Sequence, residues 1–366
     1  YIIDNDLLKT PSESLILSYF TEKTIMLTSQ LVFYLSKQLK CDRLHTVYTF
    51  KPGKVFNKFI KEMTDNRRMG DAMNSNTDEK VLANLSKQAS NSSIGKSLLR
   101  KDRHRHTYVV NDRKASKLIN DPFYSSLEEV SPHINEVMMR KKIVKHDMPI
   151  LVGVAVYSLA KIEILKFIYD FLFKFCDRDL ISIIGHDTDS LWFCVASDEL
   201  DACVKDELKR DFYKEYNSYL VAVACPKHHE AWVECRMAGL PWYMEDHSCC
   251  VKYHKYYSRQ PLLFKIEQKC DMFYGLSSKT YWSGSFGDEP KIKFSTKGIS
   301  KTHSDITKDH FISVLETKQP VRGVNYQFSV KNSDIYRCKQ ERYGLSYLYL
   351  KRNVQPCGYR TTPINL

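Results

Sequence analysis

The order of apolar and polar residues predicts a chain in which helices and strands are mixed. Apolar residues recur at helical spacing in some stretches, and in others they alternate with polar residues or form short runs. Helices are predicted over residues 13–38, 56–63, 78–99, 149–175, 197–220 and 307–317. Strands are predicted over residues 44–50, 106–110, 181–184, 191–195, 262–267 and 272–282, and a polar loop over residues 67–77.

Two of the predicted helices have features that define them further. The helix over 78–99 opens with Asp78 and Glu79, which suit the positive end of a helix dipole. Its apolar positions are expected to be Leu82, Leu85 and Ala89. The helix that begins at Pro149 is amphipathic, with one broad apolar face that we expect to pack against a sheet. That face carries Ile164, Phe167, Ile168, Phe171 and Phe175.

Composition places the chain among globular proteins that have a basic surface. It has 366 residues, 43% of them hydrophobic, and a formal net charge of +12. These values lie outside the disordered and collagen-like ranges. The length suits two or three domains, and it equally suits one enzyme core with subdomains.

Cysteine usage and charge in the apolar stretch indicate the cellular setting. The 11 cysteines include no CxxC pair, which argues against a secreted disulfide framework and favours the nucleus or the cytoplasm. The most apolar stretch, 149–175, carries five charged residues, whereas a membrane span needs about 20 predominantly apolar ones. No transmembrane helix and no membrane partner are therefore expected.

Two carboxylates lie between two short apolar runs. Residues 181–184 and 191–195 flank Gly-His-Asp-Thr-Asp-Ser, a pattern that predicts a β-hairpin with Asp187 and Asp189 at its tip. Carboxylates held this close together are costly unless a divalent cation binds them, and phosphoryl transfer by two metal ions uses such pairs. The alternative is an ordinary acidic turn, because Asp is common in turns for its own backbone hydrogen bonds.

A second candidate site lies in the helix predicted over 78–99. Lys87, Asn91 and Gly95 are spaced by four residues and therefore share one helix face. A lysine on such a face can bind phosphate oxygens, and a glycine lets a flat group approach the backbone. The alternative is a solvated helix face that ends near a glycine.

Taken together, these segments resemble motifs of family B DNA polymerases. The stretch from Lys87 to Gly95 resembles that family's K-x3-N-S-x-Y-G motif, and 187–190 resembles its Y-x-D-T-D-S motif. The Lys279-Thr280-Tyr281 segment resembles the K-x-Y motif of the protein-primed branch. The wider pattern is similar to polymerases of Maverick/Polinton transposons and related viruses. It recurs here as Pro149-Ile150-Leu151-Val152-Gly153, Gly275, Lys297-Gly298-Ile299 and Lys351-Arg352-Asn353-Val354.

The resemblance implies a role for each matching residue. Asp187 and Asp189 would be catalytic and would bind two Mg²⁺ ions, for which Mn²⁺ can substitute. Nucleotide binding would fall to Lys87, Asn91, Ser92, Gly95 and Thr188. Lys279, Tyr281 and Lys297 would bind DNA at the primer terminus.

The resemblance also implies a fold and a set of partners. The expected fold is α+β, a polymerase right hand with an antiparallel palm sheet, helical fingers and a small thumb. Its expected parts are a palm-associated segment at 1–40, fingers at 41–105, palm at 106–275 and the K-x-Y segment with the thumb at 276–366. The expected partners are a primer-template DNA, dNTPs and a terminal priming protein.

The sequence departs from the family pattern at several places. Ile94 replaces the usual aromatic residue and His186 replaces the usual tyrosine. The family's D-x2-S/N-L-Y motif, which carries the other metal-binding aspartate, does not occur in the chain. Since Tyr1-Ile2-Ile3 resembles the middle of a strand, we expect that motif to lie upstream and this chain alone to be inactive. The alternative function is that of a catalytically inactive, nucleic-acid-binding remnant of such a polymerase.

Cysteines and histidines gather between residues 225 and 250. The spacings Cys225-x2-His228 and His247-x2-Cys250 are those of metal ligands, so a zinc site is one reading. The other is ordinary reduced thiols beside surface histidines. The residues concerned are Cys225, His228, His229, Cys235, His247, Cys249 and Cys250.

Basic residues cluster in three further stretches. They lie at 96–105, 140–145 and 291–301, and at least two of them are expected to contact the DNA backbone. Such runs also occur as plain solvated surfaces.

Overall fold

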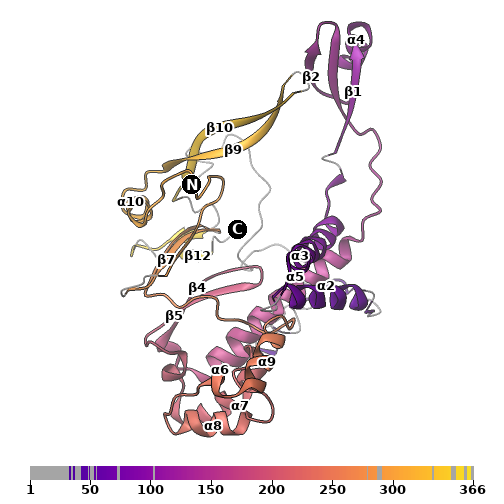
Figure 1. Cartoon of the computed structure of the whole chain (residues 1–366). Helices are drawn as coiled ribbons and strands as arrows, with labels where there is room; N and C mark the ends of the chain where they lie inside the picture. The colour runs from indigo at the N-terminus through magenta and orange to yellow at the C-terminus, as the bar shows by residue number, and fades with distance from the viewer. Residues whose placement is uncertain are drawn as a thin grey trace. The chain divides into compact units, whose positions relative to one another are not determined.

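The computed structural model describes most of the chain from residue 56 onward. The described residues are 33, 36–37, 43–47, 49, 53–54, 56–71, 75–101, 104–277, 279–286, 291–331, 334–347, 352–357 and 361–363. They fall into two compact units (Figure 1). The first contains Arg105–Lys142 and the described part of Gln268–Leu366, and the second contains Ile143–Glu267 and the described part of Leu27–His104.

Helices α2 (Asn57–Gly70) and α3 (Thr77–Ser97) form a hairpin in the second unit. The Asn76 side chain accepts from the Glu79 N–H at 2.8 Å, and the Glu79 carboxylate accepts from the Asn76 N–H at 2.9 Å. This reciprocal capping box fixes the start of α3 and confirms the helix predicted over 78–99. The loop predicted over 67–77 is wrong for 67–70, because α2 continues to Gly70, where a Cβ would overlap Ala83 of α3.

The packing face of α3 differs from the one predicted. Leu82 and Leu85 are exposed, at 42% and 57%, and Ala89 is exposed as well. The helix instead buries Ser86, whose hydroxyl accepts from the Asn66 amide of α2 at 3.1 Å. Small side chains let the backbones of α2 and α3 come close. The face of α3 that contacts α2 therefore consists of small and polar residues, which the spacing of apolar residues does not predict.

Helix α5 (Ile150–Lys166) runs on into a π-helical turn, η2 (Phe167–Leu172), and the short α6 (Phe173–Phe175). The predicted helix from Pro149 is thus confirmed. Of its predicted apolar face, Phe167, Phe171 and Phe175 lie in the largest hydrophobic core of the described residues. There Phe171 stacks on Phe212 and Tyr219, with ring centroids 5.1 and 4.9 Å apart.

The rest of the second unit packs around this core. Strands β4 (Ile181–Asp187) and β5 (Ser190–Val195) form an antiparallel hairpin, and helices α7 (Lys209–Tyr219), α8 (His229–Met237) and α9 (Ser248–Tyr257) follow. Short 3₁₀ turns lie at Arg178–Leu180 (η3), Leu200–Cys203 (η4), Asp206–Leu208 (η5) and Met244–Asp246 (η6). Aromatic side chains of α7 and α8 pack with those of η2 and α6 in this core. The helices that carry them lie together in the lower part of Figure 1.

Two predicted elements of this unit are wrong in extent. The helix predicted over 197–220 begins only at Lys209, because the chain before it bonds elsewhere: Asp177 N–H donates to Cys203 O at 2.9 Å and Lys205 N–H to Phe175 O at 3.0 Å. The strand predicted over 262–267 is reduced to one bridge at Phe264, which pairs with Leu220.

Two predictions concern the N-terminal part. The described residues 43–47 and 49 are not a strand, and Leu44 and Val47 are 59% and 64% exposed. An isolated strand with no partner is not stable, so this prediction is wrong for the described positions. The helix predicted over 13–38 lies outside the described residues except at 33, 36 and 37, of which 33 and 36 are helical and 37 is in a turn.

The described residues of the first unit form four antiparallel sheets. The order β1-β3-β2 joins Arg105–Asn111, Ile134–Arg140 and Tyr124–Ser131, and α4 (Asp112–Ile119) packs on this sheet through Ala115. The order β6-β7-β8 joins Met272–Ser277, Thr280–Gly284 and Ile292–Ser295. Two further pairs are β9 (Val321–Lys331) with β10 (Asp334–Leu345) and β11 (Arg352–Val354) with β12 (Thr361–Pro363). The strands predicted at 106–110 and 272–282 are confirmed as β1 and as β6 with β7.

Helix α10 (Lys308–Thr317) confirms the helix predicted over 307–317 and closes the core of this unit. Its Phe311 and Val314 are fully buried with Leu276, Trp282 and Ile299. The described residues thus confirm a mixture of helices and antiparallel sheets, as an α+β fold requires. Among them, no helix combines the length and apolar character needed to span a membrane.

Candidate active site

The two carboxylates of the predicted hairpin lie at its tip. Asp187 is the last residue of β4 and pairs with Ser190, the first residue of β5. Thr188 and Asp189 form the two-residue loop between them. Asp187 is half-buried and Asp189 is exposed, so Asp189 is open to a ligand from solvent.

The backbone of the tip is tightly constrained. Asp189 N–H donates to Asp187 O at 2.7 Å around Thr188, which has a φ of 56°. This is the pattern of a γ-turn with positive φ, a strained conformation for a β-branched residue. The Thr188 hydroxyl donates to Asp187 Oδ1 at 3.2 Å, and the Ser190 hydroxyl donates to Asp187 O at 3.1 Å. Backbone strain held by such bonds is a recurrent feature of functional sites.

The base of the hairpin is anchored in the core. Ile181 is buried, and Leu191, Phe193 and Val195 pack against the core, with the Phe193 ring 6.4 Å from Phe167 of η2. The register of the two strands shifts between Ile183 and Gly185, where a β-bulge twists the strand before the tip. The carboxylates therefore stand on a hairpin fixed at its base.

A cation lies next to the hairpin tip. Lys161 of α5 has its Nζ 3.5 Å from His186 Nε2, one residue before Asp187. Desolvation of the imidazole, and after it the charge of Lys161, lowers the pKa of His186 against the opposing charge of Asp187. Sequence analysis missed Lys161, because nothing in its spacing points to the hairpin.

The second set of predicted residues lies on the open face of α3. Lys87, Asn91, Ser92 and Gly95 are all exposed, as their shared spacing predicts. A Cβ added to Gly95 would meet no atom within 4 Å, so nothing in the described chain covers the backbone there. The opposite face carries the buried Ser86 and Ser97.

Helix α5 supports both sets (Figure 1). Near its start, Gly153 lies against Leu98 and Ser97 at the end of α3, and a Cβ there would come 2.6 Å from Ser97 Oγ. Near its end, Lys161 reaches His186 of the hairpin. Helix α5 thus contacts both the end of α3 and the residue before the hairpin tip within the same unit.

Lys279 and Tyr281 lie in the first unit at the β6–β7 turn. Lys279 is exposed and has a positive φ of 63°. Tyr281 of β7 pairs with Gly275 of β6, and its ring stacks on Phe273 with centroids 5.5 Å apart. A Cβ on Gly275 would come 2.9 Å from the Phe273 ring, so this glycine makes room for the stack.

Lys297 is exposed because of the two residues that follow it. Gly298 has a φ of 88°, a conformation that favours glycine. The turn directs Ile299 into the core, where a Cβ on Gly323 would come 2.7 Å from Ile299 Cδ1. In this segment the Lys297 side chain is therefore exposed, while the buried Ile299 side chain anchors the turn in the core.

The structure divides the cysteine and histidine candidates. Cys225, His228, Cys249 and Cys250 bring their ligand atoms within 4.8 Å of one another, and this is the only group of three or more potential metal ligands among the described residues. Cys235 bonds to the carbonyls of Leu240 and Pro241 instead, and His229 lies against Asn217 and Lys214. The His247 ring lies tilted beside the His228 ring, and His247 does not belong to the group.

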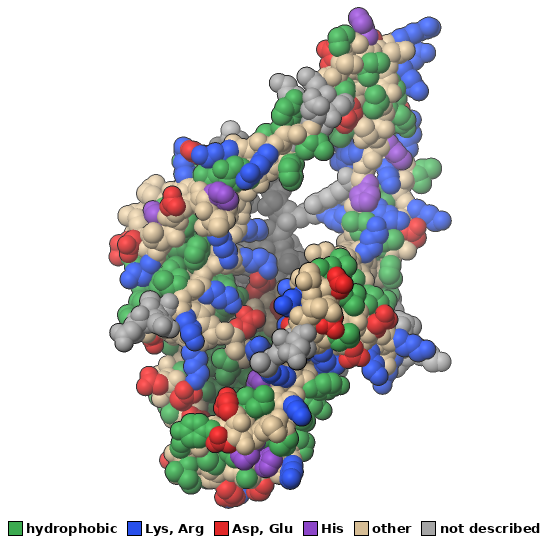
Figure 2. All heavy atoms as spheres, in the orientation of Figure 1, with side chains coloured by type: hydrophobic (Ala, Val, Ile, Leu, Met, Phe, Trp, Pro, Cys, Tyr) green, Lys and Arg blue, Asp and Glu red, His purple; other side chains and the backbone are tan. Residues whose placement is uncertain are grey.

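Two of the three basic stretches contribute a lysine to an ion pair. Lys101 pairs with Asp147, and Lys142 lies 2.7 Å from Asp121. Lys96, Arg140, Lys145 and Lys297 are exposed. Figure 2 shows Lys and Arg side chains spread over the visible surface, with acidic side chains between them. The excess positive charge is distributed and does not form one dense patch on this face.

Comparison of the chain with models of protein families, with curated proteins and with solved structures gave no match.

Proposed function

We propose that this chain is the polymerising part of a protein-primed family B DNA polymerase. The reaction is the template-directed addition of dNTPs to a primer 3′ end, in the replication of a transposon or a virus. The right-hand architecture, with its palm, fingers and thumb divided as in the sequence prediction, belongs to this proposal.

One observation carries the proposal: α5 joins a carboxylate-bearing hairpin tip to an exposed Lys-Asn-Gly helix face. Phosphoryl transfer needs metal ions at the attacked phosphorus and positive charge on the triphosphate, and both must be held in a fixed geometry. The contacts of α5 with Leu98 and His186 support this part of the proposal. An ordinary acidic turn would not need this support.

Each side chain then has a chemical role. Asp189, exposed at the tip, would hold the Mg²⁺ ions, and Asp187 would support them. Lys87 neutralises the triphosphate of the incoming dNTP. Asn91, Ser92 and Gly95 shape the pocket over the nascent base pair, and Thr188 holds the tip.

The residues of the first unit contact the primer. Lys279 at its turn and the exposed Lys297 suit phosphate oxygens, and the Phe273 ring holds Tyr281 in place. Phosphate contacts of this kind position DNA without reading its sequence. A terminal protein that supplies the priming hydroxyl is a proposed partner.

An inactive nucleic-acid-binding remnant is the second candidate. Among the described residues, no third Asp, Glu, His or Cys joins Asp187 and Asp189 in a metal-ligating group. Two-metal catalysis takes ligands from more than one strand, so this observation favours a remnant unless a further carboxylate is supplied.

Primer extension separates the two candidates. The full polypeptide encoded by the gene is incubated with a primer-template, dNTPs and Mg²⁺ or Mn²⁺. Template-directed incorporation supports the polymerase, whereas DNA binding without incorporation under either metal supports the remnant.

A further inference from the structure

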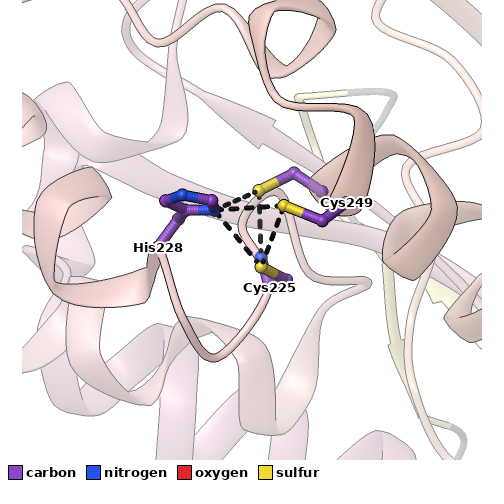
Figure 3. Close-up of side chains that lie close together, drawn as sticks. Cys225, His228 and Cys249 are labelled. Carbon is purple, nitrogen blue, oxygen red and sulfur yellow. Dashed lines mark hydrogen bonds between the residues drawn. The ribbon is translucent and has the colours of Figure 1, made fainter.

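Four side chains from two separate segments converge in the second unit (Figure 3). Cys225 and His228 lie in the turn before α8, and Cys249 and Cys250 lie in the first turn of α9. In Figure 3 the labelled side chains of Cys225, His228 and Cys249 point toward a common centre.

The separations of these ligand atoms match a tetrahedral metal site. Zinc bonds of about 2.3 Å to sulfur and about 2.0 Å to nitrogen, at tetrahedral angles, put two sulfurs about 3.8 Å apart and a sulfur and a nitrogen about 3.5 Å apart. Here Cys225 Sγ and Cys249 Sγ are 3.8 Å apart. The distances from His228 Nδ1 to the sulfurs of Cys225, Cys249 and Cys250 are 3.4, 3.3 and 3.5 Å.

Surrounding groups orient these ligands, as they do around protein-bound metals. The Cys225 backbone N–H donates to Cys250 Sγ at 3.3 Å, and the N–H groups of His228 and Lys227 donate to Cys225 Sγ. The His228 ring lies 4.6 Å from the His247 ring, which stacks on Trp242 at 4.7 Å. The imidazole is thus held by an aromatic stack and the sulfurs by backbone donors.

We propose that Cys225, His228, Cys249 and Cys250 bind one zinc ion in a closed structural site. Three sulfurs and one imidazole nitrogen are soft ligands that select Zn²⁺ over Mg²⁺. Four protein ligands leave no position for water or substrate, so the ion is structural and takes no part in catalysis. Binding releases one proton from each of the three thiols, and the loaded site carries a charge of −1. The proposal is independent of the proposed polymerase function.

The ion would tie the turn before α8 to the start of α9. Cys250 is fully buried in the core that also contains Phe171 and Phe212, so the site adjoins the core on which the β4–β5 hairpin stands. Loss of zinc is therefore expected to loosen the α7–α9 region before the rest of the unit.

Metal analysis of matched variants tests the site. Protein purified under reducing conditions should carry about one zinc per chain, and Co²⁺ substitution should give the absorption of a tetrahedral ion with thiolate ligands. Cys249→Ser should weaken zinc binding by more than about 100-fold, since even residues behind a ligand are worth about 10- to 100-fold. Cys235→Ser, in the same region but outside the cluster, should retain the metal. Equal zinc content in the two variants would overturn the site.

Alkylation of the unmodified chain tests the same site without a variant. Cys249 and Cys194 are both exposed. With zinc bound, Cys249 should resist iodoacetamide and Cys194 should react; after removal of zinc by a chelator, both should react. Reaction of Cys249 at the rate of Cys194 in the zinc-loaded protein would contradict the proposal. So would a Cys225–Cys249 disulfide in protein purified under reducing conditions.

Discussion

Gly153 of α5 lies against Leu98 so closely that a Cβ added to the glycine would stand 2.6 Å from Leu98 Cδ2. The contact lets α5 hold the end of α3, and with it the face that carries Lys87, Asn91 and Gly95. Position 153 therefore requires glycine, because the packing of α5 against Leu98 leaves no room for a side chain there.

Gly153→Ala should destabilise the second unit. The new methyl group overlaps Leu98 and Ser97, and overpacking of this kind costs about 1–3 kcal/mol. Gly95→Ala is the matched control, because its Cβ meets nothing and alanine favours a helix by about 0.5–1 kcal/mol. Chemical denaturation should thus show opposite signs for the two variants. A Gly153→Ala protein as stable as the unmodified chain would mean that the α3–α5 contact is looser than described.

Asp201 should contribute stability that disappears in acid. It pairs with Arg236 and accepts from the Tyr213 hydroxyl at 2.8 Å. Burial raises the pKa of this carboxyl, but the hydrogen bonds from Arg236 and Tyr213 outweigh it, and the pKa lies below its ordinary value. Asp201→Asn should therefore lower the free energy of unfolding by about 1–3 kcal/mol at pH 7.

The lowered pKa of Asp201 determines how its contribution to stability changes with pH. A carboxyl with a lowered pKa in the folded state stabilises above its unfolded pKa of about 3.9, and the contribution is lost as the pH falls through the folded value. The difference between the unmodified chain and Asp201→Asn should shrink below pH 4. Asp206→Asn, at a side chain 97% exposed, should change stability by less than about 0.5 kcal/mol. A difference that stays constant into acid would rule out the ionised carboxylate as its source.

DNA binding should depend steeply on salt and little on sequence. The net charge of +12 comes from Lys and Arg, and exposed members such as Lys145 and Lys297 suit phosphates. Each phosphate contact lowers the slope of log K against log salt by about 0.9. Titration of labelled primer-template duplexes of two unrelated sequences at several salt concentrations measures both properties. A flat salt dependence would remove charge as an argument for a nucleic-acid partner.

Lys87 should act on the nucleotide more than on DNA. Loss of a charge-assisted contact to the triphosphate costs about 1.5–3 kcal/mol, so Lys87→Ala should raise the KM for dNTP about 10- to 150-fold in the full gene product. Lys58→Ala, at an exposed lysine of α2, is the control and should leave the KM unchanged. Steady-state incorporation kinetics check this prediction, and equal KM values for the two variants would remove Lys87 from the nucleotide site.

The sequence predicts the parts of this fold that are set by local pattern. The hairpin at 181–195 and the helix from Pro149 are confirmed because short apolar runs and a long apolar face are strong local signals. The packing of α3 was not predictable in the same way, since it buries Ser86 and exposes Leu85. The faces through which α3 packs are determined by the close approach of helix backbones, and the spacing of apolar residues does not predict this approach.

The candidate sites can likewise be predicted only as far as local pattern determines them. The spacing of Lys87, Asn91 and Gly95 predicts their shared exposed face, because a helix has a fixed period. By contrast, the sequence could not select Cys249 over Cys235 or His228 over His229 as cluster members. That choice depends on how α9 packs beside the turn before α8, which is a tertiary contact between segments about 20 residues apart in the chain.

The most direct test of the account is Mg²⁺-dependent primer extension by the full polypeptide that the gene encodes, with Asp189→Asn compared with Asp198→Asn. Asp198 is an exposed carboxylate just after β5 and lies outside the tip. The account predicts that Asp189→Asn reduces extension by at least about 100-fold, because loss of a metal ligand removes several kcal/mol of transition-state stabilisation, and that it leaves DNA binding nearly intact. Asp198→Asn should extend primers at the unmodified rate. Full activity in Asp189→Asn would contradict the assignment of the hairpin tip as a polymerase active site.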